Sequence, residues 1–204
     1  GDTEPEFFAP RLTCFGFQYL YVDVAVWGDD AESSNELPEL IAVGADFISS
    51  CGPKIGTFAC SNPLFNEIDQ MIDRSVASNL QHVVTDCPHR EKLCWLEVPH
   101  LMGPSILFHY DMGDLFRKIC RDTADSQLEN GLVPDIAPEY VRFKDGFFES
   151  PEWGSASVQL PWLIYQWYGN EQILREQYPA MTRYTDYLAG IRNEAGLVKG
   201  GLGD

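Results

Sequence analysis

The chain has 204 residues, and its 31 acidic and 14 basic side chains give a formal net charge of −17. Hydrophobic residues make up 45% and aromatic residues 13% of the sequence, which excludes a disordered chain and allows a packed core. The acidic balance argues against nucleic acid or an anionic membrane surface as a partner, and no apolar run approaches the roughly 18 residues of a membrane span.

The first 57 residues are predicted to be β structure. Residues 15–27 are aromatic and β-branched without helical spacing, and both alternating faces are largely apolar, as in a strand buried on both sides. An acidic loop at 28–38 separates them from a second short β-like run at 41–48. Two or three strands do not close a sheet, so we expect the final strands of a β domain that begins upstream.

From residue 61 the spacing of apolar residues changes to the helical period of about 3.6. Asn62 and Pro63 predict a helix start, and apolar residues from Leu64 to Leu80 predict one buried helix face. Further helices are predicted near 99–110, 113–129, 155–169 and 171–189. The alternation of helices and loops favours an α-solenoid or an α/α toroid.

The loop at 82–98 concentrates residues that a glycosidase needs. It contains Asp86, Arg90, Glu91, Trp95 and Glu97. In such an enzyme one protonated carboxyl group donates to the leaving oxygen, other carboxylates bind sugar hydroxyls, and an aromatic ring stacks on the sugar. For any single residue the alternative is a solvated loop with ordinary ion pairs, and it has about equal weight.

The loop at 130–154 has a similar composition and ends near Trp153. Sugar stacking and a tryptophan that fills the gap between helix ends are close alternatives for this residue. The four histidines form no HExxH motif and the six cysteines no CxxC pair, so the sequence indicates no metal site. It also lacks GxSxG, GxGxxG and GxxxxGK[ST], which leaves serine hydrolases and nucleotide binding without support.

The segment DCPHREKLCWLE at 86–97 resembles the signature of α-L-rhamnosidases of glycoside hydrolase family 78, which is close to DCPxR(D/E)E-x-LGW. FGFQY at 15–19, LVPDIAP at 132–138 and WGSA at 153–156 are similar to other blocks of that family. The resemblance implies a mixed fold, in which residues 1–57 are the C-terminal strands of a β-sandwich domain. Residues 58–204 would be the N-terminal part of a mainly helical (α/α)6 toroid catalytic domain.

The resemblance also implies inverting hydrolysis of a terminal α-L-rhamnosyl bond without a cofactor. Glu91 matches the general acid, and the proposed substrate-binding residues are Asp86, Arg90, Trp95, Glu97 and Trp153. The general base of the family is a glutamate that lies downstream of the position of residue 204. The chain begins GDTEPEFF and ends GGLGD, so we expect a piece of a longer polypeptide, whose remainder completes the barrel. Secretion or a periplasmic location follows by family analogy only.

Three departures from the family pattern keep other functions open. The match of Glu91 assumes a one-residue deletion, because an ungapped alignment places Lys92 at the acid position. Cys94 replaces the usual glycine, and Val98 stands where an aspartate often follows. A non-catalytic sugar-binding homologue with a decayed site is therefore one alternative. Another exo-glycosidase of the α/α-toroid type, or a lyase, is the second. The expected partner in each case is a carbohydrate, bound without a metal or a cofactor.

Overall fold

The computed structural model describes residues 5–23, 39–143 and 146–200. Its contacts divide the chain into two compact units, Gly1–Ile48 and Ser49–Asp204. The assignment of 1–57 and 58–204 to a β-sandwich and an (α/α)6 toroid remains a prediction.

The described residues of the first unit, 5–23 and 39–48, form neither helix nor strand. Their large side chains are exposed, with Phe15 at 67%, Tyr19 at 89% and Ile41 at 70% of full exposure. The β structure predicted for these segments is not formed here, because a strand needs a second backbone to pair with and the described residues supply none. Residues 24–27 of the first predicted strand and the acidic loop at 28–38 lie outside the described residues.

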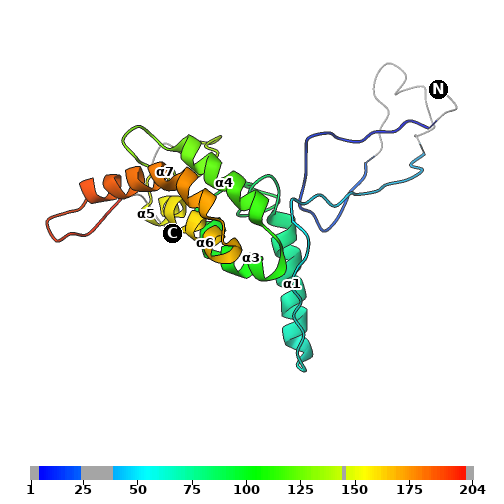
Figure 1. Ribbon diagram of the computed structural model, residues 1–204. Helices are drawn as coiled ribbons and strands as arrows, with labels where there is room; N and C mark the ends of the chain where they lie inside the picture. The colour runs from blue at the N-terminus through cyan, green and yellow to red at the C-terminus, as the bar shows by residue number, and fades with distance from the viewer. Residues whose placement is uncertain (1–4, 24–38, 144–145, 201–204) are drawn as a thin grey trace, which may run out of the picture. The chain divides into compact units, whose positions relative to one another are not determined.

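The described part of the second unit is helical (Figure 1). The helices are α1 (Pro63–Asn79), α2 (Glu97–Leu101), α3 (Gly103–His109), α4 (Gly113–Ser126), α5 (Pro151–Gly154), α6 (Ala156–Tyr168) and α7 (Glu171–Gly190). None of the helices in the described ranges is both long and apolar enough to cross a bilayer.

Local sequence accounts for most helix ends. The Asn62 side chain accepts a hydrogen bond from the Leu64 N–H at 3.0 Å and caps α1, as predicted. Gly169 ends α6 with a φ of 65°, a left-handed conformation that glycine adopts without a steric penalty. Asn170 then caps α7 by accepting from the Ile173 N–H at 3.2 Å.

Two helix predictions differ from the structure in detail. The helix expected near 99–110 is two short helices, α2 and α3, which meet at Met102. Trp153, expected in a loop before a helix start at Ser155, lies in the single helical turn of α5. Pro151 occupies the first turn of α5, where its missing N–H leaves no intrahelical bond unmade.

The prediction that α1 buries an apolar face is wrong for the described residues. No residue of α1 is buried, and Leu64 and Met71 are 57% and 63% exposed. Leu80, just after the helix, is fully buried. The apolar spacing is present, but no other described element packs on most of this face.

Polar contacts, together with the packing of Val76 on the core, hold α1 against the neighbouring segments. Asp73 accepts hydrogen bonds from the Lys54 ammonium at 2.7 Å and the Tyr110 hydroxyl at 2.6 Å. The His109 Nε2 lies 3.3 Å from an oxygen of Asp69. Burial by itself would raise the pKa of Asp73, but the donors Lys54 and Tyr110 outweigh it and lower that pKa.

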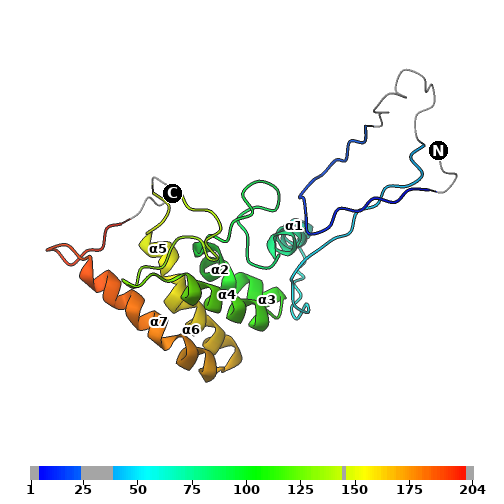
Figure 2. The ribbon, with the colours of Figure 1, turned by 90° about the horizontal axis from the view of Figure 1, so that it is seen from above.

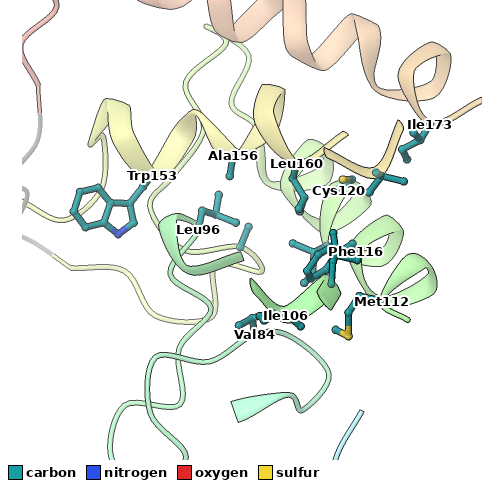
Figure 3. Close-up of a cluster of buried hydrophobic side chains, with 14 of the residues drawn as sticks. Val84, Leu96, Ile106, Met112, Phe116, Cys120, Trp153, Ala156, Leu160 and Ile173 are labelled. Atoms are coloured by element: carbon teal, nitrogen blue, oxygen red, sulfur yellow. The ribbon is translucent and has the colours of Figure 1, made fainter. Parts of the chain in front are cut away.

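The core lies where α6 packs against α7, α4 and α2, and Figure 2 shows α6 and α7 side by side. Phe116 of α4, together with Leu160 and Ile164 of α6, is almost fully buried. Figure 3 shows Phe116, Leu160 and Cys120 together in this cluster, with Trp153 at one end of the residues drawn. Burying such side chains is the main favourable term in the stability of this unit.

Short turns lie at one end of the helices. The Tyr168 hydroxyl, at the end of α6, accepts a hydrogen bond from the Met112 N–H at 2.9 Å and donates to Asp111 at 2.8 Å. It therefore joins the α3–α4 turn to the α6–α7 turn. Because α4 and α7 both run away from these turns, the long connection that follows α4 starts at the opposite end.

Candidate functional site

Backbone hydrogen bonds hold two long connections together. The first loop (residues 80–96) precedes α2, and the second loop (residues 127–150, described except for 144–145) follows α4. The Leu96 N–H donates to the Asp135 carbonyl at 2.8 Å, and the Ala137 N–H donates to the Cys94 carbonyl at 3.2 Å. These bonds flank an antiparallel bridge between Trp95 and Ile136. The two loops in which the sequence concentrates acids and aromatics therefore lie side by side.

The first loop closes on itself at Asp86. The Asp86 N–H donates to the Leu93 carbonyl at 3.1 Å, and the Leu93 N–H donates to Asp86 Oδ1 at 2.9 Å. Residues 88–91 form the turn between these two positions. Lys92 has a φ of 57°, which is uncommon for a residue with a side chain and lets the chain reverse toward Leu93. One oxygen of Asp86 therefore shapes the loop that carries Glu91.

Three residues make hydrogen bonds with Glu91 at this turn. Its Oε1 lies 2.5 Å from the Arg90 guanidinium, and its Oε2 accepts from the Trp95 indole N–H at 3.0 Å. Its backbone N–H donates to the Cys87 sulfur at 3.2 Å. The Glu91 side chain is 33% exposed and that of Arg90 is 75% exposed, so both groups reach solvent. Of the six predicted site residues, Glu91, Arg90 and Trp95 are thus in direct contact.

Two phenylalanines of the second loop pack on Trp95. The Phe143 ring is stacked on the indole with centroids 5.5 Å apart and an interplanar angle of 13°. The Phe147 ring meets it edge-on, with centroids 5.9 Å apart. The sequence prediction did not include these residues. The available signal was the recurrence of phenylalanine at 143, 147 and 148 in a long loop.

Asp135 anchors the second loop from within the protein. It is fully buried, and its two oxygens accept from the Ser150 N–H at 2.7 Å and the Ser150 hydroxyl at 2.8 Å. Burial raises the pKa of Asp135 above its ordinary value, although the two Ser150 hydrogen bonds act in the opposite direction. This carboxyl group contacts the backbone of its own loop, and it positions the strand-like segment that pairs with Trp95.

Trp153 and Glu97 lie in the short helices α5 and α2, outside the turn at 88–91 that carries Glu91. Trp153 is 8% exposed and belongs to the core cluster, and its indole nitrogen is buried without a hydrogen bond to the described residues (Figure 3). That burial fits the alternative of a tryptophan that fills the space between helix ends. Glu97 is the half-buried first residue of α2. The substrate contacts predicted for these two residues stay predictions.

A small hollow lies beneath the first loop. It has a volume of about 160 Å³ and is lined in part by Asp86, Val98, Asn79 and Thr85. Val98 therefore faces the same hollow as Asp86, at the position where the family pattern often has an aspartate. Glu91 is not among the residues that line it. The described residues thus form parts of a site rather than one enclosed pocket.

Cys94, which replaces the usual glycine of the family pattern, is a buried residue of the core. The Cys94 side chain is fully buried, and this burial raises the pKa of its thiol to about 12. Such a thiol stays protonated and packs as a small apolar group. Within the described ranges, no group of three or more His, Cys, Asp or Glu side chains is arranged to hold a metal ion.

Comparisons with known proteins identify the family to which the chain belongs. Residues 53–204 match the family described as the bacterial alpha-L-rhamnosidase six-hairpin glycosidase domain. An alpha-L-rhamnosidase of Formosa agariphila is 28% identical over 211 residues, which cover 100% of this chain and 21% of that protein. The chain spans about a fifth of the length of the curated relatives it matches.

Solved structures show the same similarity. The alpha-L-rhamnosidase of Aspergillus terreus matches with a TM-score of 0.68 and 30% identity, over 74% of this chain and 17% of that one. The Streptomyces avermitilis alpha-L-rhamnosidase complexed with L-rhamnose matches with a TM-score of 0.65 and 27% identity, over 71% of this chain and 14% of that one. Since the family match covers most of its residues, the chain belongs to the bacterial α-L-rhamnosidase six-hairpin glycosidase domain family.

Proposed function

We propose that the polypeptide containing this chain is an inverting glycoside hydrolase that removes terminal α-L-rhamnosyl residues from glycans or glycosides. The observation that carries the proposal is the geometry of Glu91, which sits on a closed turn between the Arg90 guanidinium and the Trp95 indole. Family membership supports the reaction class. The rhamnose complex of the Streptomyces avermitilis protein supports the choice of sugar.

The proposed chemistry needs one acid and one base. Glu91 in its protonated form gives its proton to the glycosidic oxygen as the bond from this oxygen to the anomeric carbon breaks. A water molecule attacks the opposite face of the sugar and gives its proton to a second carboxylate. In inverting enzymes the two carboxyl groups are about 6.5–9.5 Å apart, which leaves room for this water. We place the base in the part of the polypeptide that follows residue 204.

Arg90 and Asp86 supply the proposed contacts to the sugar hydroxyls. The Arg90 side chain is 75% exposed, so its unshared N–H groups are open to a ligand while it contacts Glu91. Asp86 uses Oδ1 for the Leu93 N–H and lines the hollow beneath the loop. The family resemblance also implies substrate contacts for Trp95, Glu97 and Trp153.

The proposal includes the domain assignment. Residues 1–57 would close a β-sandwich by pairing with strands elsewhere in the polypeptide, and residues 58–204 would form the first part of an (α/α)6 toroid. The exposed aromatic side chains between Phe15 and Tyr21 support this, because pairing would bury them. Export from the cytoplasm is part of the same proposal, and fractionation of the producing cells checks it.

Replacement of Glu91 by glutamine in the complete polypeptide tests the acid. We expect kcat on an alkyl or disaccharide α-L-rhamnoside to fall by about 10²–10⁴-fold, because an amide cannot donate the required proton. Glu171→Gln is the matched control, since Glu171 is 67% exposed and pairs with Arg175 on α7. Proton NMR of the first-formed sugar should show the β anomer. Full activity of Glu91→Gln would contradict the acid assignment.

The same experiments separate the alternatives. Release of saturated free rhamnose excludes a lyase, which leaves an unsaturated product. An initial α anomer would mean that the reaction retains the configuration. Absence of turnover by the unmodified polypeptide, together with retained rhamnose binding in calorimetry, would instead show a non-catalytic sugar-binding homologue.

A further inference from the structure

Trp95 is enclosed on the side of the second loop. Phe143 lies nearly parallel to the indole with centroids 5.5 Å apart, so it covers one face of the ring. Phe147 contacts the indole at a steep angle of 71° and also lies 6.1 Å from Phe143. The antiparallel bridge to Ile136 fixes the backbone of Trp95 as well. The indole is therefore held by its own loop and by the facing one.

The polar edge of this ring points at the candidate acid. The indole N–H donates to Glu91 Oε2 at 3.0 Å. An indole has a single donor in a fixed direction on a rigid ring, so the position of the ring sets the position of that oxygen. A glutamate side chain has three rotatable bonds, and without such a contact it samples several rotamers. The arrangement thus fixes the orientation of a carboxyl group that must meet one oxygen of the substrate.

We propose that Trp95 is a positioning residue for Glu91, and that Phe143 and Phe147 set the angle at which its N–H meets the carboxyl group. The proposal rests on the proposed function, in which Glu91 is the general acid. It differs from a role for Trp95 as a sugar-stacking wall, because it uses the indole N–H that donates to Glu91 and not a face of the ring. The second loop thereby contributes to proton donation although its side chains do not touch Glu91 in the described contacts.

The test compares leaving groups in the complete polypeptide. Trp95→Phe keeps an aromatic ring and removes the N–H. Misplacing a general acid slows the departure of a poor leaving group, such as a sugar or alkyl alkoxide, which needs a proton. A 2,4-dinitrophenyl rhamnoside needs little protonation. We expect kcat to fall by about 10-fold or more on the alkyl or disaccharide substrate. KM for both substrates and kcat on the dinitrophenyl substrate should stay within about twofold of the unmodified values.

Two further variants complete the design. Trp167→Phe is the matched control, because Trp167 packs edge-on against Phe108 in the α6–α3 contact and lies outside the site. It should leave both substrates unaffected. Phe143→Leu keeps the indole N–H and removes the stacked ring, and it should give a smaller loss with the same dependence on the leaving group. This variant decides the question if Trp95→Phe does not fold, as judged by circular dichroism.

Several results would overturn the proposal. A rise in KM for both substrates with unchanged kcat would show that Trp95 binds the sugar rather than orienting Glu91. An equal loss of kcat on both substrates, or no loss on either, would also contradict a positioning role for Trp95. Glu91→Gln is measured in parallel. If this variant keeps full kcat on the alkyl rhamnoside, the proposed function itself fails. If Glu91→Gln is impaired on that substrate and Trp95→Phe is not, only the role of Trp95 is wrong.

Discussion

Asp135 shows at the level of one residue how a carboxyl group in a site loop acquires a structural role. The family pattern around it matches a block of sequence, but the pattern does not say whether this carboxylate faces a substrate or the protein. In the structure both of its oxygens accept from Ser150, and its side chain is fully buried. The backbone carbonyl of Asp135 accepts a hydrogen bond from the Leu96 N–H and so supports the pairing of the two loops.

This contact predicts different outcomes for two replacements of Asp135. Asp135→Ala leaves the Ser150 N–H without an acceptor in a buried place, and we expect it to lower the free energy of unfolding by about 1–3 kcal/mol. Asp135→Asn keeps an acceptor for this N–H, and its amide can donate to the Ser150 hydroxyl, so we expect a smaller loss. Urea unfolding of the complete polypeptide, followed by tryptophan fluorescence, measures both. Equal losses would show that Ser150 does not depend on this side chain.

The same residue predicts a pH dependence of stability. Burial raises the folded-state pKa of Asp135 above the ordinary value of about 3.9. Between the ordinary pKa of the unfolded chain and the raised pKa of the folded protein, the folded protein binds more protons than the unfolded chain. Stability therefore falls as the pH rises from the first pKa to the second. Asparagine does not titrate. The free energy of unfolding of Asp135→Asn should therefore increase relative to the unmodified protein as the pH rises above about 4. An unchanged difference from pH 3 to 7 would contradict the assignment.

The candidate acid could be predicted from the sequence, but its surroundings could not. Arg90 and Glu91 are adjacent, and Trp95 follows four residues after Glu91, so the three groups belong to one short sequence motif. Phe143 lies 48 residues after Trp95, and only the pairing of the two loops brings the rings together. Trp153 was assigned to the substrate by resemblance, whereas its burial depends on the packing of α5 on the core.

At the level of elements, sequence predicted helices well and their partners poorly. Caps such as Asn62 and Gly169 are local features: Asn62 marks the start of α1, as predicted, and Gly169 marks the end of α6. The predictions of a buried face on α1 and of a strand at 15–27 depend on what packs against or pairs with these segments. The described residues contain no partner for most of the α1 face and no backbone that pairs with residues 15–23 as a strand. A hydrophobic pattern identifies a surface that favours burial, and it does not supply the element that covers it.

The attachment of α1 therefore depends in part on polar contacts, and we predict that Tyr110→Phe loosens it. This change removes the hydroxyl that donates to Asp73 at 2.6 Å and leaves the ring in place. Hydrogen exchange of the α1 backbone amides in the complete polypeptide should become faster at pH 7. Tyr178→Phe is the control, because Tyr178 is 64% exposed. Unchanged exchange in Tyr110→Phe would show that the apolar contacts near Leu80 hold the helix without it.

Acid should have a related effect on α1. The folded-state pKa of Asp73 is lowered, so its contribution to stability is present above the ordinary aspartate pKa of about 4 and is lost as the pH falls through the lowered value. Protection of the α1 amides, corrected for the intrinsic exchange rate, should therefore decrease at acid pH. Asp73→Asn should begin with lower protection and lose less of it. An equal acid-dependent loss in both proteins would assign the effect to other carboxyl groups.

At the scale of the whole molecule, the 204-residue chain exposes apolar surface on a helix. Leu64, Ile68, Met71 and Ile72 of α1 are 57%, 37%, 63% and 43% exposed. A contiguous exposed apolar face of this kind favours association. We expect the chain, produced alone, to self-associate as its concentration rises in size-exclusion chromatography with light scattering. A monodisperse monomer that unfolds cooperatively would contradict this.

Two sets of variants locate the surface responsible. Replacing Leu64 and Met71 by glutamine should increase the monomer fraction, because it interrupts the face without removing a buried contact. Leu197→Gln is the control, since Leu197 is 64% exposed and lies beyond α7. If the control has the same effect as the α1 variants, association does not depend on this helix.

The pairing of the two site loops has a consequence for evolution. Leu96 and Ala137 each donate a backbone N–H across the bridge, and backbone hydrogen bonds make few demands on side-chain identity. The register of the loops therefore depends little on which side chains lie along the bridge itself. Substitutions there would leave the tip that carries Arg90 and Glu91 in place, so the frame can vary in sequence while the side chains that it presents keep their positions.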